Sequence, residues 1–104
     1  MALNDRGYNY NKLEINTYAR AKAGIYGLFR GANWVYFGEA IDIRDRLIQH
    51  KDRDRVEQPC IALADPTGFC FEEVVGGKEA RVAAQDRWIL ACQGTQRLCN
   101  QKLG

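Results

Sequence analysis

Long apolar stretches are missing from this 104-residue sequence. No run of apolar residues approaches the roughly 20 that a membrane-spanning helix needs. The first twelve residues, MALNDRGYNYNK, also lack the apolar segment of a secretory signal peptide. We therefore expect a protein without a membrane partner that resides in the cytoplasm.

Metal-ligand patterns are also scarce. His50 is the only histidine, and none of the four cysteines forms a Cys-x-x-Cys pair. Structural zinc sites need such spacings, so the sequence argues against one. In a cytosolic protein we expect four reduced thiols, several of them buried as small apolar residues.

An excess of one charge is absent as well, since 15 basic and 13 acidic side chains leave a net charge of +2. Basic residues nevertheless gather in segments 44–55 and 81–104, and acidic ones in segment 65–79. This distribution allows a basic face that binds phosphate, with Arg44, Lys51 and Arg53 as candidate substrate contacts. Solvated helix surfaces are the simpler explanation of the same charge runs.

The length predicts one domain spanning 1–104, with residues 1–10 as a loosely held arm. Residues 12–22 fit either a short helix or the approach to a strand, residues 51–58 read as a charged loop, and residues 59–64 remain unassigned. Turn formers, alternation and helical spacing predict the other elements: strands at 24–30, 34–37 and 69–75, and helices at 43–51 and 78–92.

The predicted order is β-β-α-β-α, beginning with a hairpin. This order favours a small α/β fold of the α+β kind, in which helices flank a three-stranded antiparallel sheet.

Four polar groups follow one another in the hairpin and the helix after it. The tripeptide GIY at 24–26 precedes YFG at 36–38, and Arg46 and His50 lie four residues apart on one side of the helix. Cross-strand packing of two tyrosines and a solvated Arg–His face are the ordinary explanations of such residues. Phosphodiester cleavage, however, requires a group that deprotonates water and cations that stabilise charge on phosphorus. Together these residues supply both.

These tripeptides and their spacing to Arg46 and His50 resemble the GIY-YIG nuclease superfamily, over nearly the whole chain. The resemblance implies that Tyr26 is the general base or positions water, with Tyr36 in support. It implies that Arg46 binds the scissile phosphate, that His50 assists, and that Asn100 completes the site. The implied activity is divalent-metal-dependent endonucleolytic hydrolysis of DNA.

The resemblance also implies one glutamate on the last helix as the protein ligand of Mg²⁺ or Mn²⁺. Counting back from Asn100 places Gln85 at this position, with Glu79 as the fallback ligand and Asp86 about 100° around the helix. A neutral amide holds Mg²⁺ far more weakly than a carboxylate. We expect weakened cleavage, and we favour an engineered Glu-to-Gln replacement over natural loss because the other five positions match.

Position 39 is a second departure, since Glu39 follows YFG where many members carry lysine. Two other functions stay open. One is a non-catalytic nucleic-acid-binding module that retains the fold, and the other is a small interaction domain without a nucleic-acid role. The sequence does not distinguish single- from double-stranded DNA.

Overall fold

The structure is a computed structural model that describes residues 7–92 and 98–100. The elements, in chain order, are β1 (Tyr8–Asn9), α1 (Lys12–Tyr18), β2 (Gly24–Arg30), β3 (Asn33–Ala40), α2 (Ile43–Glu57), α3 (Pro59–Ala64), β4 (Gly68–Glu73) and α4 (Gly77–Cys92). The two strands of the predicted hairpin, β2 and β3, and the last helix, α4, are present close to their predicted bounds.

The sheet has four antiparallel strands in the order β1-β4-β2-β3, so the predicted number of three is wrong. The additional strand is β1, which pairs Tyr8 with Phe69 and Asn9 with Gly68. Tyr8 also stacks on Tyr18 of α1, with ring centroids 4.5 Å apart. Part of the predicted loose arm is therefore held in the sheet, while residues 1–6 of that arm lie outside the described residues.

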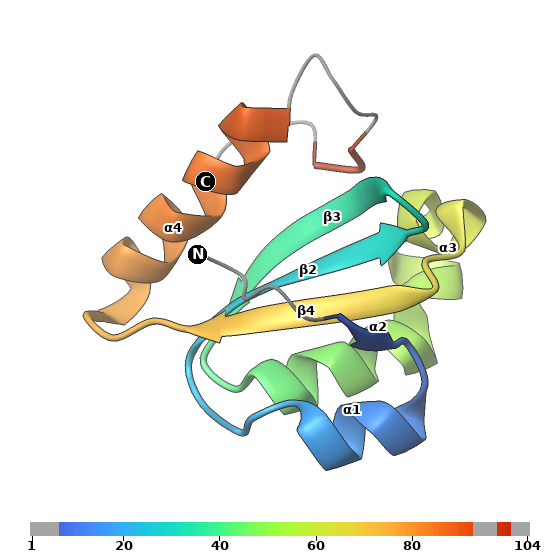
Figure 1. Cartoon of the computed structure of the whole chain (residues 1–104), viewed down its shortest axis with the longest axis horizontal. Helices are drawn as coiled ribbons and strands as arrows, with labels where there is room; N and C mark the ends of the chain where they lie inside the picture. Colours follow the sequence, from blue (N-terminus) through green and yellow to red (C-terminus); the bar gives the residue numbers. More distant parts are fainter. Residues whose placement is uncertain (1–6, 93–97, 101–104) are drawn as a thin grey trace.

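Helices cover both faces of the sheet. Figure 1 shows α1, α2 and α3 on one face and α4 alone on the other. Alternate residues of a strand point to opposite faces, so β2 contributes to two separate cores. Tyr26 and Leu28 are buried with Ile43 and Leu47 of α2, whereas Ile25 is buried with Ile89 of α4. The domain is thus α+β, as predicted.

Helix α2 continues to Glu57, so the prediction of a charged loop at 51–58 is wrong. The extension has a specific partner, because Asp54 is buried and lies beside His50 one turn earlier. The segment that remained unassigned forms α3, with Pro59 in its first turn, where a missing N–H costs nothing. The ambiguous segment forms α1, capped by the Asn11 side chain.

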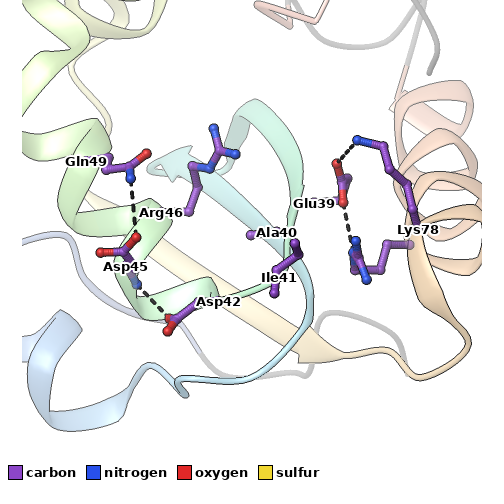
Figure 2. A pocket seen from close by; sticks show the side chains of 9 residues that line it. Glu39, Ala40, Ile41, Asp42, Asp45, Arg46, Gln49 and Lys78 are labelled. Carbon is purple, nitrogen blue, oxygen red and sulfur yellow. Dashed lines mark hydrogen bonds and ion pairs between the residues drawn. The ribbon is translucent and has the colours of Figure 1, made fainter.

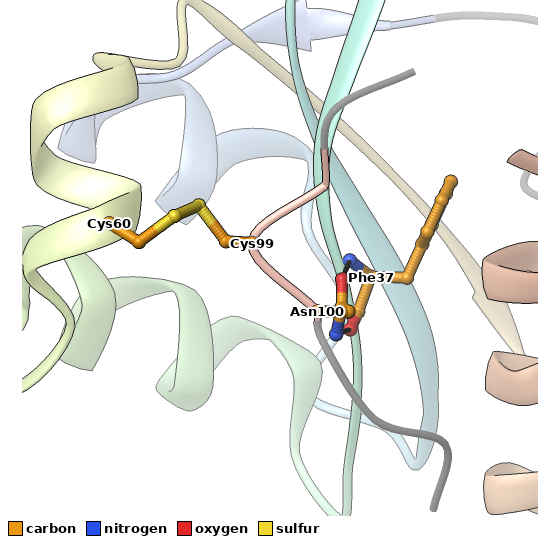
Figure 3. Close-up of a disulfide and its surroundings, with 4 residues drawn as sticks. All are labelled: Phe37, Cys60, Cys99 and Asn100. Atoms are coloured by element: carbon orange, nitrogen blue, oxygen red, sulfur yellow. Dashed lines mark hydrogen bonds between the residues drawn. A yellow bond between two sulfur atoms is a disulfide. The ribbon is translucent and has the colours of Figure 1, made fainter. Parts of the chain in front are cut away.

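A disulfide joins Cys60 of α3 to Cys99, so the expectation of four reduced thiols is wrong. Figure 3 shows this bond beside the outer edge of β3. Cys70 and Cys92 are buried thiols, and burial raises the pKa of the Cys70 thiol to about 12. The two bonded cysteines differ from the other two in their place in the fold, and no local sequence pattern distinguishes them.

Among the helices described, none is both long and apolar enough to cross a membrane.

Candidate functional site

Three side chains form a hydrogen-bonded chain between the sheet and α2. The Tyr26 hydroxyl lies 2.6 Å from Nε2 of His50, and both carboxylate oxygens of Asp54 lie 2.9 Å from Nδ1 of His50. All three side chains are buried, and Tyr26 is only 2% exposed. Sequence reasoning missed Asp54, although its i,i+4 spacing from His50 on a helix was a usable signal.

The geometry assigns the protons of this chain. A neutral imidazole has one N–H donor and one acceptor nitrogen. Nδ1–H of His50 donates to the Asp54 carboxylate, so Nε2 accepts the hydroxyl proton of Tyr26. Burial lowers the pKa of His50 and outweighs the opposing charge of Asp54, which keeps the ring neutral at pH 7. Burial also raises the pKa of Tyr26 well above its usual value, so this tyrosine stays protonated.

Glycine at position 38 makes room for the Tyr26 side chain. Tyr26 of β2 pairs with Gly38 of β3 in the sheet register, and a Cβ at position 38 would overlap the Tyr26 ring and hydroxyl. The glycine of the YFG tripeptide therefore has a packing reason. It allows the tyrosine of the GIY tripeptide to lie across the neighbouring strand towards His50.

Tyr36 and Arg46 stand beside this chain. The Tyr36 ring centroid lies 5.5 Å from that of His50 and 6.3 Å from that of Tyr26. Arg46 is exposed on α2, one turn before His50. Burial raises the pKa of Tyr36, and the positive charge of Arg46 partly offsets that effect. The structure thus brings four of the five predicted catalytic residues together.

A cleft of about 360 Å³ opens next to Arg46, between the start of α2 and the start of α4 (Figure 2). It is lined by three cations, three carboxylates and three uncharged residues: Arg46, Lys78, Arg81, Glu39, Asp42, Asp45, Ala40, Ile41 and Gln49. Asp42 caps α2 by accepting from the Asp45 N–H at 2.9 Å, and Asp45 accepts from the Gln49 amide at 3.2 Å. These two carboxylates are engaged in holding the helix.

Glu39 is engaged with α4. Its Oε1 accepts from Nε of Arg81 at 2.9 Å, and its Oε2 accepts from Nζ of Lys78 at 3.2 Å. Burial acts to raise the pKa of Glu39, but its hydrogen bonds and charge contacts with these two cations hold that pKa below its usual value. Glu39 is therefore ionised at neutral pH and already has two cationic partners.

The predicted metal-ligand positions lie away from the cleft wall. Gln85 is buried on α4 one turn beyond Arg81, and Glu79 is exposed in the first turn. The α4 side chains that line the cleft are Lys78 and Arg81. Residues 7–92 and 98–100 contain no group of three or more His, Cys, Asp or Glu side chains arranged to hold a metal ion. The carboxylates that do line the cleft, Glu39, Asp42 and Asp45, already accept hydrogen bonds from the protein, and as arranged they do not form a ligand set that fits Mg²⁺ or Mn²⁺.

Three of the four remaining predicted site residues have hydrogen-bond partners in the surrounding structure: Asn100, Arg44 and Lys51. Asn100 lies at the edge of β3, where its amide N–H donates to the Phe37 carbonyl at 2.8 Å and its Oδ1 accepts from the Phe37 N–H at 2.7 Å (Figure 3). Nε of Arg44 donates to the Ala19 carbonyl, and Nζ of Lys51 donates to the Tyr10 carbonyl. Arg53 is exposed on α2.

Comparison of the chain with protein-family models, with curated proteins and with solved structures finds no match in any of the three.

Proposed function

We propose that this domain is an endonuclease of the GIY-YIG kind that binds a DNA phosphodiester in the cleft beside Arg46 and hydrolyses it slowly. The observation that carries the proposal is the Tyr26–His50–Asp54 chain, which lies next to an exposed arginine. A buried relay of this kind accepts a proton, and the arginine binds a phosphate in a fork geometry. Both are needed at the same place for hydrolysis.

The residues divide the chemistry as follows. Arg46 holds the phosphate and stabilises the charge that develops on its oxygens. Tyr26 is buried behind the residues that line the cleft, so the relay carries the proton away from the site of attack. As the water oxygen bonds to phosphorus, its proton passes to the Tyr26 oxygen while the Tyr26 proton moves to Nε2 of His50, and Asp54 stabilises the resulting imidazolium. The bond from phosphorus to the leaving oxygen then breaks, and that oxygen takes a proton from solvent. Tyr26 never has to become a free tyrosinate, which its raised pKa disfavours.

Hydrolysis is expected to be slow. A divalent ion in such a site would supply Lewis-acid stabilisation of the phosphate, and the cleft lacks a donor set that fits one. We expect this domain to be more similar to nucleases in its DNA binding than in its rate of DNA cleavage.

A cleavage assay on single- and double-stranded DNA tests the proposal. We expect slow cutting by the native chain, a loss of at least about 100-fold in Tyr26→Phe, and weaker binding together with loss of cutting in Arg46→Ala. Tyr18→Phe and Arg55→Ala are matched controls, because both side chains are exposed and lie outside the cleft lining and the relay. Equal cutting by Tyr26→Phe and the native chain would overturn the relay.

Gln85→Glu tests the ligand position that the resemblance implies. If position 85 supplies the metal ligand, the variant cuts faster with Mg²⁺ or Mn²⁺. An unchanged rate agrees with the buried place of Gln85 outside the cleft lining.

A second candidate function is a non-catalytic DNA-binding module. It is favoured by the partners of the cleft carboxylates, because Glu39 is paired with Lys78 and Arg81 while Asp42 and Asp45 accept hydrogen bonds within α2. Under this function no variant cuts DNA, yet Arg46→Ala still weakens binding. Absence of DNA binding even at low ionic strength would exclude both functions.

A further inference from the structure

Glu39 occupies the place where the cations of α4 could meet a phosphate. It projects from β3 towards α4, and Figure 2 shows its carboxylate facing Lys78 and the neighbouring guanidinium. Each carboxylate oxygen has one cationic partner, Arg81 at 2.9 Å and Lys78 at 3.2 Å. A phosphate is held by the same donors in the same geometry, because it too presents pairs of oxygen acceptors.

The two partners differ in how firmly they hold Glu39. The Arg81 side chain is 9% exposed and that of Glu39 is 17% exposed, so this pair is largely shielded from water. The Lys78 side chain is 72% exposed, and ion pairs in water contribute little. Lys78 is thus the partner that can leave Glu39 at small cost.

Among the described residues, Glu39 is the only hydrogen-bond partner of the Arg81 guanidinium, so its other N–H groups can serve a second acceptor. Its bond to Glu39 uses Nε, and a guanidinium carries five N–H donors in a fixed fork. Arg46 reaches the same cleft from α2, on the other side. Three cations therefore line a cleft of about 360 Å³, a volume within the roughly 300–1,000 Å³ of protein ligand pockets.

We propose that Glu39 is an internal counter-ion which a nucleic-acid phosphate displaces, and that Arg46, Lys78 and Arg81 hold this phosphate without a divalent metal. The inference rests on the proposed function, since it concerns the same cleft. The resemblance implies a lysine after the YFG tripeptide and a glutamate on the last helix. Here the charges are exchanged, because β3 supplies the carboxylate of Glu39 and α4 supplies the cations Lys78 and Arg81. Glu39 lowers affinity in this arrangement rather than contributing to it.

Direct binding of a short duplex and a matched single strand, with EDTA and with Mg²⁺ at equal ionic strength, tests the inference. We expect Glu39→Gln to bind DNA about tenfold more tightly than the native chain, because the variant lacks the negative charge that repels the phosphate. The slope of log affinity against log salt should steepen by roughly 1, the value for one more phosphate contact. The control is Glu57→Gln, which removes an equal charge from an exposed position at the end of α2.

Mg²⁺ should leave the affinity of the native chain unchanged. If Mg²⁺ strengthens binding by the native chain but not by Glu39→Gln, Glu39 is a metal ligand and the counter-ion role is overturned. Equal affinities of Glu39→Gln and Glu57→Gln overturn it too. A failure of every variant to bind DNA at low salt is a different result, because it overturns the proposed function itself.

Lys78→Gln keeps the test decisive if Glu39→Gln folds poorly, since Lys78 lies mostly in water. We expect this variant to bind DNA a few-fold more weakly and to lose roughly one unit of salt slope. Lys22→Gln, at an exposed position before β2, is its control. Equal binding by the two lysine variants contradicts a phosphate contact at Lys78.

Discussion

Tyr26 and His50 place a hydroxyl and a ring nitrogen 2.6 Å apart in the interior, although 24 residues separate them in the sequence. The bond joins the central strand β2 to helix α2, and Asp54 extends it by one further turn of that helix. A single polar chain thus ties together the elements that carry the GIY tripeptide and the Arg–His pair. Its removal should affect stability as well as chemistry.

Tyr26→Phe removes the hydroxyl and leaves a buried acceptor, Nε2 of His50, without its donor. Such a loss costs about 1–3 kcal/mol of unfolding free energy. Urea unfolding measures the difference, and Tyr18→Phe is the control because Tyr18 is 44% exposed. If Tyr26→Phe unfolds at the same urea concentration as the native chain, the hydrogen bond contributes nothing to stability.

The buried His50 makes stability depend on pH. Its folded-state pKa lies below the usual value of about 6.5, so the unfolded chain takes up a proton first as pH falls. The contribution of His50 is therefore complete above about pH 6.5 and is lost progressively below it. Unfolding measured between pH 7 and pH 5 should show this decline, and His50→Gln should flatten it. Burial raises the pKa of Asp54, so its effect on stability has the opposite sign. From its folded-state pKa down to the usual value of about 4, a fall in pH increases the stability contributed by Asp54.

Asp54→Asn separates the two effects on His50. Burial lowers the His50 pKa while the Asp54 charge opposes that shift, so removing the carboxylate should lower the pKa further. His50 is the only histidine, and its ring signals can be followed by NMR without assignment ambiguity. A rise in the His50 pKa in Asp54→Asn would contradict this account.

The sequence predicted the hairpin, the last helix and the beginning of α2, because strand alternation and helical spacing are local patterns. That Tyr26, Tyr36, Arg46 and His50 form one site was expected from the family resemblance and not from these patterns. It failed at segment 51–58, where charged residues read as a solvated loop. Asp54 is charged yet buried, and its reason is a specific partner one turn away. Polarity alone does not reveal such a partner, whereas the i,i+4 spacing of Asp54 from His50 indicates it once the helix is extended.

Long-range features were also hidden. The Cys60–Cys99 bond joins residues 39 apart, and nothing near either cysteine indicates the pairing. The contact between Glu39 and Arg81 spans 42 positions and depends on how α4 crosses the sheet. Spacing from Asn100 indicated Gln85 as the metal-ligand position, whereas the α4 side chains that line the cleft are Arg81, one turn earlier, and Lys78, about two turns earlier.

Gly38→Ala should be strongly destabilising, because the added methyl group would overlap the Tyr26 ring and hydroxyl. Overpacking of this kind typically costs 1–3 kcal/mol, occasionally more. We expect a lower unfolding midpoint and loss of DNA cutting together, since Tyr26 must move. Gly31→Asn is the control, because position 31 has open space and a positive φ that asparagine tolerates. A Gly38→Ala variant of native stability would contradict the packing role of this glycine.

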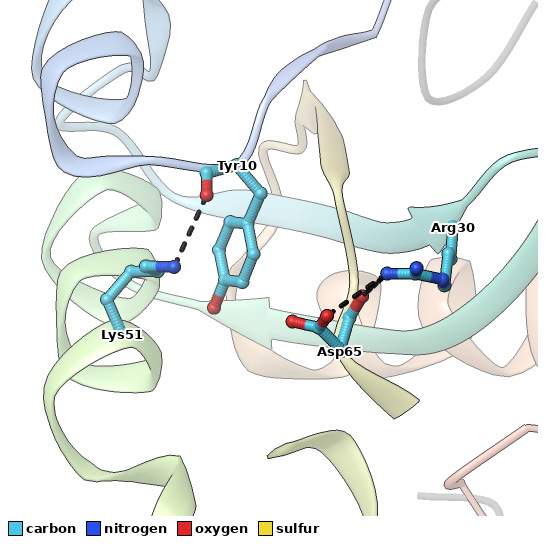
Figure 4. Close-up of polar contacts among 4 residues, drawn as sticks. All are labelled: Tyr10, Arg30, Lys51 and Asp65. Carbon is cyan, nitrogen blue, oxygen red and sulfur yellow. Dashed lines mark hydrogen bonds and ion pairs between the residues drawn. The ribbon is translucent and has the colours of Figure 1, made fainter. Parts of the chain in front are cut away.

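Tyr10→Phe should leave stability unchanged or raise it by about 1 kcal/mol. The Tyr10 hydroxyl is buried and has no hydrogen-bond partner within the described part of the chain, an arrangement that costs free energy. Lys51 contacts the other parts of this residue, with Nζ 3.3 Å from its carbonyl oxygen and 4.5 Å from its ring centroid (Figure 4). Phenylalanine preserves both contacts. A clear loss of stability on urea unfolding would show that the hydroxyl has a partner after all.

Reduction of the Cys60–Cys99 disulfide should destabilise the domain by about 2–4 kcal/mol, because the bond closes a long loop of the unfolded chain. It also holds the segment in which the Cys99 N–H donates to the Val35 carbonyl and Asn100 brackets Phe37 at the edge of β3. Thermal unfolding with and without a reductant measures the effect. Cys60→Ala and Cys99→Ala should each reproduce the reduced midpoint, and neither should respond to reductant, since Cys70 and Cys92 are already thiols. A native midpoint that reductant leaves unchanged would contradict a stabilising role for this bond.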